Sequence, residues 1–419
     1  MRRRRIDRPV VVVGAGHAGL ATSYCLKRRG IEHVVFERGR VGQDWRDARW
    51  DGFRTVTPNR QCRLPGFPYA GAEPDSFMDR DAVVAHLEAY VATFGPPLLE
   101  GVGVTELRHD PEGGFELATS DGEFSAGQVV VATGGLHVPR VPRFAERLPA
   151  YIEQVSSADY RHPDDLPEGD VLVVGSGQSG CQIAEECHRA ARTVHLCVGG
   201  APQTARSYRG RDVAAWLEDL GHNDVRAREP RLGEGTRHTA DHVVGVDLRR
   251  LAREGLRLYG RLLGVEDAVL RFAPDLRANL DAADAAADTV KDAIDAHIAA
   301  RVIDAPLEAR TDPVWEPGVQ PRLLDVEAAG IQSVVWCTGY DSDYRWVQAP
   351  IFDGRGRPCH ERGVTDVPGL YVIGLPWLYT RASGRFAGIA RDAEYLTELI
   401  EIGDRRATVT QLPRPAFGR

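Results

Sequence analysis

The sequence predicts an α/β protein with two Rossmann-like dinucleotide-binding domains, one inserted in the other. Three observations predict this fold. A glycine motif occurs twice, at residues 14–19 and 175–180, each time directly after an apolar strand. A glutamate ends the second strand after the first motif, whereas no acid follows the second motif. Two late apolar stretches, 331–340 and 369–374, return the chain to a sheet.

Both glycine motifs read Gly-x-Gly-x-x-Gly between a strand and a helix start. In that setting the first glycine makes a tight turn and the second lets the backbone approach a pyrophosphate. The third lets the helix pack closely on the strand, and the helix N-terminus holds the phosphates. The motif residues are Gly14, Gly16 and Gly19 in the first copy and Gly175, Ser176, Gly177, Gln178, Ser179 and Gly180 in the second. Two complete copies predict two bound dinucleotides, between which electrons pass.

The residue 23 positions after the first glycine distinguishes the two sites. In the first unit this residue is Glu37, and a carboxylate there accepts hydrogen bonds from the hydroxyls of an adenosine ribose, as FAD or NAD requires. In the second unit it is Val198, which permits the 2′-phosphate of NADP. Three arginines follow: Arg206, Arg209 and Arg211. They supply positive charge for that phosphate, or they form a solvated basic loop. We therefore expect FAD in the first site and NADPH in the second, with NADH as an alternative.

The order of these units along the chain predicts the domain organisation. Residues 1–165 are expected to form the first part of an FAD domain, and residues 325–419 its second part. Residues 166–324 are expected to form the NAD(P)H domain, with a helical insertion that includes an amphipathic helix at 278–301. Prolines at 139, 142 and 149 mark the first crossing between the domains.

Composition excludes several other classes of function. The net charge is −8, so no nucleic acid partner is expected, and the run of arginines at 2–5 is interpreted as a solvated tail. No apolar run is long enough for a membrane span and no signal peptide precedes the first strand, which predicts a soluble cytoplasmic chain without a membrane partner. The seven cysteines contain no C-x-x-C pair, so neither a redox disulfide nor a metal site is predicted.

Further landmarks lie outside the glycine motifs. They are the turn Gly-Gln-Asp-Trp-Arg at 42–46, the Thr-Gly turns at 133–134 and 338–339, and the strand that ends at Gly374. Together with the motifs, these landmarks resemble the class B flavoprotein monooxygenases, which include the flavin-containing monooxygenases, the plant indole-pyruvate monooxygenases and the Baeyer–Villiger enzymes. The resemblance covers nearly the whole chain.

Other stretches look like a narrower subfamily of bacterial flavin-dependent oxidoreductases from nitrilase-bearing, cyanide- or nitrile-associated gene clusters. These stretches are 49–59, 64–69, 208–212, 313–316 and 375–379. The resemblance implies an FAD-dependent, NAD(P)H-consuming monooxygenase that acts through a C4a-(hydro)peroxyflavin. It also implies O₂ and a small, nitrogen-containing molecule as substrates. A homodimer is one oligomeric state that the sequence permits.

The chain departs from the monooxygenase signature F-x-G-x-x-x-H-x-x-x-(Y/F)-(K/R). The stretch 151–161 keeps the Tyr160-Arg161 ending but has Ser156 in place of the histidine. The asparagine that flavin-containing monooxygenases place near the flavin aligns with Val56. An NAD(P)H-dependent flavoprotein dehydrogenase or oxidase that releases H₂O₂ therefore stays a rival function. The complete second motif disfavours a third one, a non-catalytic FAD sensor.

The predicted site residues fall into three sets. The FAD set is Gly14, Gly16, Gly19, Glu37, Arg38, Gln43, Trp45, Thr57, Val104, Ala132, Thr133, Gly134, Gly374, Leu375, Ser383, Gly384 and Arg385. The NADP set is Gly175, Ser176, Gly177, Gln178, Ser179, Gly180 and Arg206. The sequence assigns no catalytic residue, and the candidates are Asn59, Ser156 and Trp377. Tyr208 is a further pocket-wall candidate. His17 and His137 lie beside predicted cofactor turns, where a structural role is the more common one.

Overall fold

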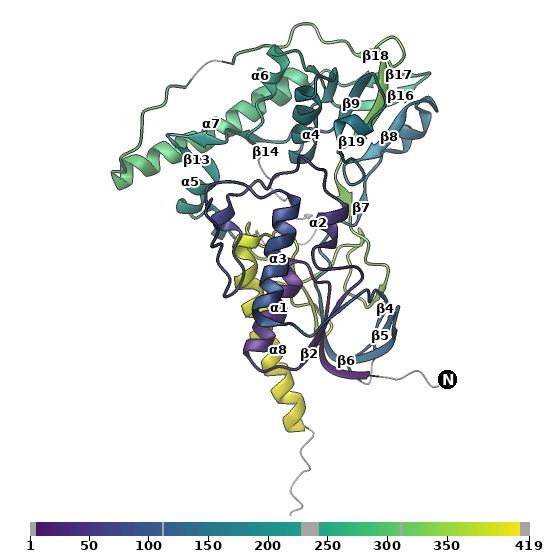
Figure 1. Cartoon of the computed structure of the whole chain (residues 1–419), viewed down its shortest axis with the longest axis vertical. Coiled ribbons are helices and arrows are strands. Elements are labelled where there is room, and N and C mark those ends of the chain that lie inside the picture. Colours follow the sequence, from purple (N-terminus) through teal and green to yellow (C-terminus); the bar gives the residue numbers. More distant parts are fainter. Residues whose placement is uncertain (1–5, 111–112, 228–242, 311–312, 411–419) are drawn as a thin grey trace, which may run out of the picture.

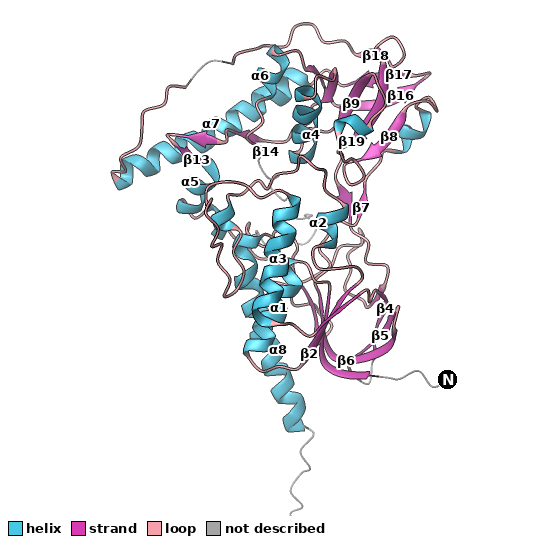
Figure 2. Cartoon of the chain, in the orientation of Figure 1, coloured by secondary structure: helices cyan, strands magenta, loops and turns pink. Residues whose placement is uncertain are grey.

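The computed structural model describes residues 6–110, 113–227, 243–310 and 313–410. Two sheets, each flanked by helices, lie in the lower and upper halves of Figure 1, and Figure 2 shows the same layers by secondary structure. This arrangement confirms the predicted α/β fold class. The arginine run at 2–5 lies outside the described residues.

The first sheet has the strand order β21-β4-β5-β6-β1-β2-β3, and β22 adds to β6. Its strands are β1 (Ile6–Val13), β2 (His33–Glu37), β3 (Leu98–Glu100), β4 (Val104–His109), β5 (Phe115–Thr119), β6 (Gly122–Val131), β21 (Val347–Gln348) and β22 (Leu370–Val372). Its helices are α1 (His17–Arg28), α2 (Gln43–Asp47), α3 (Arg80–Phe94) and α8 (Phe386–Thr410). The strands β1, β2, β3, β6 and β22 pair in parallel with one another, so their carboxyl ends meet at one edge of the sheet. Ligands of open parallel sheets bind at that edge.

The second sheet has the order β15-β10-β9-β19-β8, and every pair in it is parallel. Its strands are β8 (Glu153–Ser156), β9 (Asp170–Val174), β10 (Val194–Cys197), β15 (Arg257–Tyr259) and β19 (Ile331–Trp336). The helix α4 (Gln178–Arg189) follows β9, as α1 follows β1. The two sheets are therefore built around the same strand–turn–helix unit.

Two strands of the second sheet lie outside the range 166–324 that the sequence predicts for the nucleotide domain. These strands are β8 and β19, which pair with each other. The chain crosses between the sheets at β7 (Val138–Pro139) and β20 (Tyr340–Asp341), which form an antiparallel ribbon. Sheet membership depends on pairing between strands about 180 residues apart, and such pairing leaves no local signal at residue 165 or 324. The division into domains stays a prediction.

The chain between β10 and β19 forms smaller elements around the second sheet. These are β11 (Gln203–Thr204), β12 (Ser207–Tyr208), β13 (Arg211–Asp212), α5 (Val213–Asp219), β14 (Val243–Val244), α6 (Leu248–Arg253), β16 (Leu262–Glu266), β17 (Val269–Phe272), α7 (Leu276–Arg301) and β18 (Leu323–Asp325). Short 3₁₀ helices cover Asn59–Gln61, Arg143–Arg147, Pro163–Asp165 and His222–Asp224. The long helix α7 confirms the predicted helix 278–301, and its face with Leu280, Val290, Ile294 and Ile298 is buried.

Apolar side chains cover both faces of each sheet. The α-helices pack on one face, whereas the cluster on the opposite face is formed with residues of β4 and β5 in the first sheet and of β16 and β17 in the second. In β1, Val10 and Val12 pack with α1 and α8, while Val11 and Val13 face the opposite cluster. Within the described residues, each helix is either too short or too polar to cross a membrane.

Candidate functional site

The first glycine turn joins β1 to α1, and each of its three glycines meets a different requirement. Gly14 has φ +103°, and a Cβ there would lie 2.8 Å from the carbonyl oxygen of Ala132. A Cβ on Gly19 would lie 1.9 Å from the carbonyl oxygen of Gly14, so the helix could not approach the strand. A Cβ on Gly16 would meet no atom within 4 Å. The backbone therefore leaves open space directly before the first helical N–H groups.

The second glycine turn repeats this geometry between β9 and α4. Gly175 has φ +110°, and a Cβ there would lie 2.4 Å from the carbonyl oxygen of Cys337. A Cβ on Gly180 would lie 1.8 Å from the carbonyl oxygen of Gly175, while Gly177 faces open space. Gly16 and Gly177 cap their helices with the same φ of −72° and ψ of −179°, and neither helix has a side-chain cap. Both turns thus offer N–H groups and room to a pyrophosphate, so they fit two dinucleotides.

Glu37 lies at the carboxyl end of β2 and faces the first glycine turn. Its side chain is nearly buried, with 9% of the residue exposed. The two carboxylate oxygens each accept one backbone hydrogen bond: Oε2 from the N–H of Ala15 at 2.8 Å, and Oε1 from the N–H of Gly39 at 3.0 Å. Each oxygen keeps acceptor capacity for a ribose hydroxyl. The carboxylate is therefore held in place by the turn that would hold the pyrophosphate, which fits FAD.

The turns after β6 and β22 complete this edge of the sheet. Ala132, Thr133 and Gly134 follow β6 directly, and the hydroxyl of Thr133 is buried without a hydrogen-bond partner. Gly374, after β22, has φ +81°, and a Cβ there would lie 2.8 Å from the Cβ of Ala18. The two turns therefore lie beside the start of α1, and the hydroxyl of Thr133 is a polar group that a bound cofactor could satisfy.

His17, the first residue of α1, connects the phosphate turn to the turn at 383–385. Its Nε2 lies 3.2 Å from the carbonyl oxygen of Gly384, and its ring lies 4.9 Å from the ring of Phe386. Burial lowers the pKa of His17 to about 4, so the ring is neutral at pH 7 and donates its hydrogen bond from Nε2. The Ser383 hydroxyl accepts hydrogen bonds from the N–H groups of Tyr379 and Thr380. No local pattern in the sequence singles out His17 for this bracing role, because its partner lies at the far end of the chain.

The segment at 38–45 lies at the rim of the same edge. Arg38 is exposed and pairs with Asp44 at 3.1 Å. The Gln43 side chain accepts a hydrogen bond from the N–H of Arg40 at 3.0 Å and donates to Asp47. The ring of Trp45 lies 6.4 Å from the ring of Phe386, which places it beside the turn 383–385. The half-buried Val104 begins β4, next to Gly103, where a Cβ would lie 3.5 Å from that of Arg38.

Among the catalytic candidates, two have side chains that hydrogen-bond within their own loops, although the Oδ1 of Asn59 is buried without a hydrogen-bond partner. The Asn59 amide donates to the carbonyl oxygen of Glu73 at 2.9 Å, and the residue is 4% exposed. The Ser156 hydroxyl donates to Asp159 at 2.6 Å and accepts from the N–H of Ala158 at 3.2 Å. Asn59 thus supports the loop at 59–76, and Ser156 caps the turn after β8.

Trp377, the third catalytic candidate, has strained backbone. Its φ is +58°, in the left-handed region that a bulky residue rarely adopts. Such strain is concentrated at functional sites, and Trp377 follows Gly374 and Leu375 of the FAD set. Its position therefore keeps it a candidate for contact with flavin or substrate.

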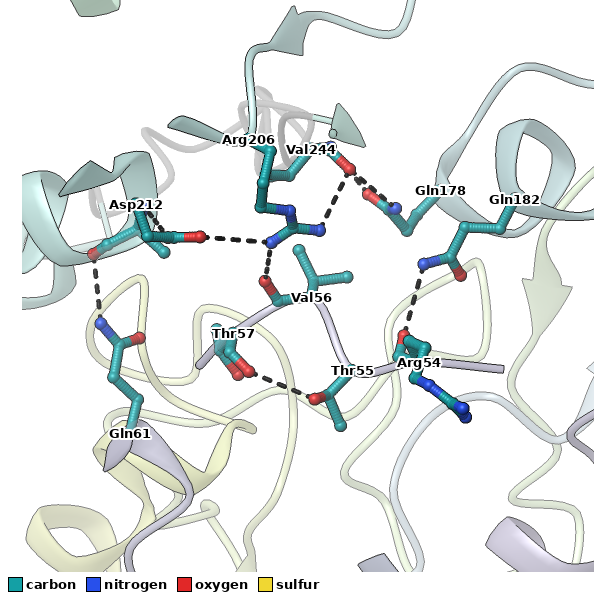
Figure 3. A network of polar contacts seen from close by, with 11 residues as sticks. Arg54, Thr55, Val56, Thr57, Gln61, Gln178, Gln182, Arg206, Asp212 and Val244 are labelled. Atoms are coloured by element: carbon teal, nitrogen blue, oxygen red, sulfur yellow. Dashed lines mark hydrogen bonds and ion pairs between the residues drawn. The ribbon is translucent and has the colours of Figure 1, made fainter. Parts of the chain in front are cut away.

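In the second site, polar side chains of the glycine turn form hydrogen bonds with the backbone of neighbouring segments. The Ser176 hydroxyl accepts a hydrogen bond from the N–H of Gly199 at 2.9 Å, at the end of β10. The Gln178 side-chain amide pairs with the backbone of Val244, accepting from its N–H at 2.8 Å and donating to its carbonyl oxygen at 3.3 Å (Figure 3). The side chain of Ser179 is half-buried at the first turn of α4.

The arginines after β10 take three different places. Arg206 donates to the carbonyl oxygens of Val56 and Val244 (Figure 3). Arg209 pairs with Asp295 of α7 at 2.9 Å. Arg211 pairs with Asp219 and stacks on Trp216. Tyr208 is 2% exposed and donates to Asp295, so it packs in the interior and forms no pocket wall.

All seven cysteines are free thiols. Five are buried, and burial raises the pKa of the Cys197 and Cys337 thiols far above the ordinary value. These two thiols are therefore protonated at neutral pH and unsuited to redox exchange.

Comparisons with known proteins agree with this geometry. A family model described as pyridine nucleotide-disulphide oxidoreductase matches residues 11–243. A protein of Geobacillus kaustophilus called "Uncharacterized oxidoreductase CzcO-like" is 33% identical over 391 residues, which is 92% of this chain and 96% of that protein. Indole-3-pyruvate monooxygenase YUCCA1 of Oryza sativa is 33% identical over 197 residues, which is 44% of this chain and 48% of that protein.

A solved structure shows the same fold over nearly the whole chain. The flavin-containing monooxygenase from Stenotrophomonas maltophilia has a TM-score of 0.66 and 19% identity, with 95% of this chain and 99% of that chain covered. These comparisons confirm the resemblance that the sequence motifs indicate. The chain belongs to the pyridine nucleotide-disulphide oxidoreductase family, and the CzcO-like oxidoreductase is related to it over nearly its whole length.

Proposed function

We propose that this protein is an FAD-dependent monooxygenase that uses NADPH and O₂ to oxygenate a small, nitrogen-containing substrate. The observation that carries the proposal is the pair of matching glycine turns, each with open space at Gly16 or Gly177 before an uncapped helix. The overall reaction balances as substrate, NADPH, H⁺ and O₂ giving oxygenated substrate, NADP⁺ and water. The bound cofactors would supply the hydride transfer and the oxygen chemistry.

The chain's own residues would bind and orient these groups. The helix start at Gly16 and the carboxylate of Glu37 would hold the two ends of the ADP half of FAD. The turn at 383–385, braced by His17, would close on the flavin ring. The helix start at Gly177 would hold the NADPH pyrophosphate. The partial identity to an indole-3-pyruvate monooxygenase supports the oxygenase outcome.

An oxidase that releases H₂O₂ is the second candidate, and two replaced residues favour it. Ser156 stands where the group's signature has a histidine, and its hydroxyl is engaged with Asp159 and Ala158. Val56 stands where the flavin-side asparagine belongs, and its side chain donates no hydrogen bond. Two groups that would position and shield oxygen near the flavin are therefore replaced.

The fate of the consumed O₂, either in the product or as H₂O₂, distinguishes the two candidate functions. Small amines, nitriles, aldehydes and thioethers would be tested under ¹⁸O₂, with NADPH, O₂ and H₂O₂ measured with and without catalase. A monooxygenase gives a product that carries ¹⁸O and forms less H₂O₂ than the NADPH it consumes. One H₂O₂ per NADPH with every compound that is turned over would identify an oxidase. The cytoplasmic location and the homodimer stay predictions from the sequence.

A further inference from the structure

We propose that Arg206 is a positioning residue that holds the flavin-side loop 54–57 against the elements around the second sheet, here called the nicotinamide-binding or second lobe. In this proposal Arg206 does not recognise the 2′-phosphate. The kinetic consequence of this role rests on the proposed function. Its structural basis is a set of contacts between two segments about 150 residues apart in the chain.

The Arg206 guanidinium contacts both loop 54–57 and the backbone at Val244 (Figure 3). Nη1 donates to the carbonyl oxygen of Val56 at 2.8 Å, and Nη2 donates to the carbonyl oxygen of Val244 at 3.4 Å. The carboxylate of Asp212 lies 3.7 Å from Nη1, and the guanidinium lies 4.2 Å from the centre of the Phe77 ring. The planar, forked guanidinium thus joins loop and lobe by two separate donors, which a lysine ammonium could not reproduce.

The surrounding backbone is shaped for this side chain. Gly245 has φ +83°, and a Cβ there would lie 2.8 Å from Nε of Arg206. A larger residue at 245 would therefore displace the guanidinium. Glycine at this position is required by the backbone conformation and by the close approach of Arg206.

Amide side chains form hydrogen bonds on either side of Val56. Gln182 of α4 donates to the carbonyl oxygen of Arg54 at 3.3 Å. Gln61 donates to the carbonyl oxygen of Ala214 at 3.1 Å and to the carboxylate of Glu218 at 3.0 Å. Arg206 contributes a charged donor between them, where hydrogen bonds are stronger.

The place of Arg206 differs from the place that a 2′-phosphate ligand needs. In a unit of this kind the adenosine ribose is expected beside the residue that follows the second strand, which here is Val198 after β10. Arg206 instead shares the carbonyl of Val244 with Gln178, at the phosphate end of the site. Its other donor faces Val56, the position that aligns with the flavin-side asparagine. Arg206 therefore lies where it would set the distance between nicotinamide and flavin.

The test compares Arg206→Ala and Arg206→Lys with the parent enzyme and a matched control, Arg277→Ala. Arg277 also donates to a backbone carbonyl, that of Pro317 at 2.7 Å, and pairs with a carboxylate, that of Glu316, but within the second lobe. One measurement is hydrogen exchange of the segment 54–61 in the FAD-bound protein without coenzyme. The other is anaerobic flavin reduction over a range of NADPH and NADH concentrations.

We expect both Arg206 variants to exchange roughly 10-fold faster in segment 54–61 and to reduce flavin about 10- to 100-fold more slowly with either coenzyme. Their half-saturating concentrations of NADPH and NADH should keep the parent's ratio, and the control should match the parent. A rise in half-saturation for NADPH alone, with lysine restoring it, would show a phosphate ligand and overturn the proposal. Unchanged exchange in segment 54–61 would also overturn it.

Two further outcomes are decided by the same experiment. If Arg206→Ala does not fold, Arg206→Lys carries the test, because it keeps the charge and removes the forked contact. If neither coenzyme reduces the parent enzyme, the proposed function fails. The exchange measurement then still decides whether Arg206 locks the loop.

Discussion

Replacing Glu37 by alanine is expected to release FAD while leaving the fold intact. The carboxylate is nearly buried at the end of β2, and the N–H groups of Ala15 and Gly39 fix its two oxygens. It therefore accepts ribose hydrogen bonds without first losing side-chain freedom. Alanine removes a charged acceptor and leaves the ribose hydroxyls facing an apolar methyl group.

The magnitude follows from the hydrogen bonds that alanine can no longer accept from the ribose. A hydrogen bond to a charged group contributes about 1.5–3 kcal/mol, which corresponds to roughly a 10- to 150-fold weaker affinity for FAD. Glutamine keeps one acceptor oxygen but places an NH₂ group against an N–H group of the glycine turn or of Gly39. We therefore expect Glu37→Gln to lie between the parent and the alanine variant.

The assay is titration of the apoprotein with FAD, followed by flavin fluorescence, with circular dichroism as the check on folding. Glu100→Ala is the matched control. Glu100 lies opposite Glu37 in the register of the parallel strands β2 and β3. It also accepts a backbone hydrogen bond, from the N–H of Val41 at 2.7 Å. Equal FAD affinity of Glu37→Ala and the parent, or equal weakening by Glu100→Ala, would refute this site.

Three other predictions concern the second lobe. Gly177→Ala should keep the parent's Tm but raise the NADPH concentration needed for half-saturation, because its Cβ would meet no protein atom and would occupy the phosphate space. Gly180→Ala should instead lower the Tm, because its Cβ would lie 1.8 Å from the carbonyl oxygen of Gly175; the reverse pattern would contradict both roles. Burial raises the pKa of Glu186 to about 7, so its contribution to stability is lost as pH rises from about 4.5 to 7. In urea unfolding, the free energy of unfolding of Glu186→Gln minus that of the parent should therefore be roughly 1–2 kcal/mol larger at pH 8 than at pH 5. The same difference at both pH values would show an ordinary, solvated glutamate.

The sequence by itself determined the two glycine turns and the acid that follows the first. These features are local, because φ near +100° at Gly14 and Gly175 and the helix–strand contact at Gly19 and Gly180 allow no side chain. The spacing from Gly14 to Glu37 is likewise set by one strand–helix–strand unit. The fold class and the strand–turn–helix unit that frames the first proposed cofactor site could therefore be predicted without coordinates.

Tertiary structure alone decided which side chains reach these turns. His17 contacts Gly384, which lies 367 residues later, and Arg206 contacts Val56 across the junction of the lobes. Conversely, the hydroxyl of Ser156 is engaged within its own turn, although its alignment suggested a role beside the flavin. Such contacts depend on how two sheets pack against each other, and packing between distant segments leaves no periodic pattern or spacing in the chain.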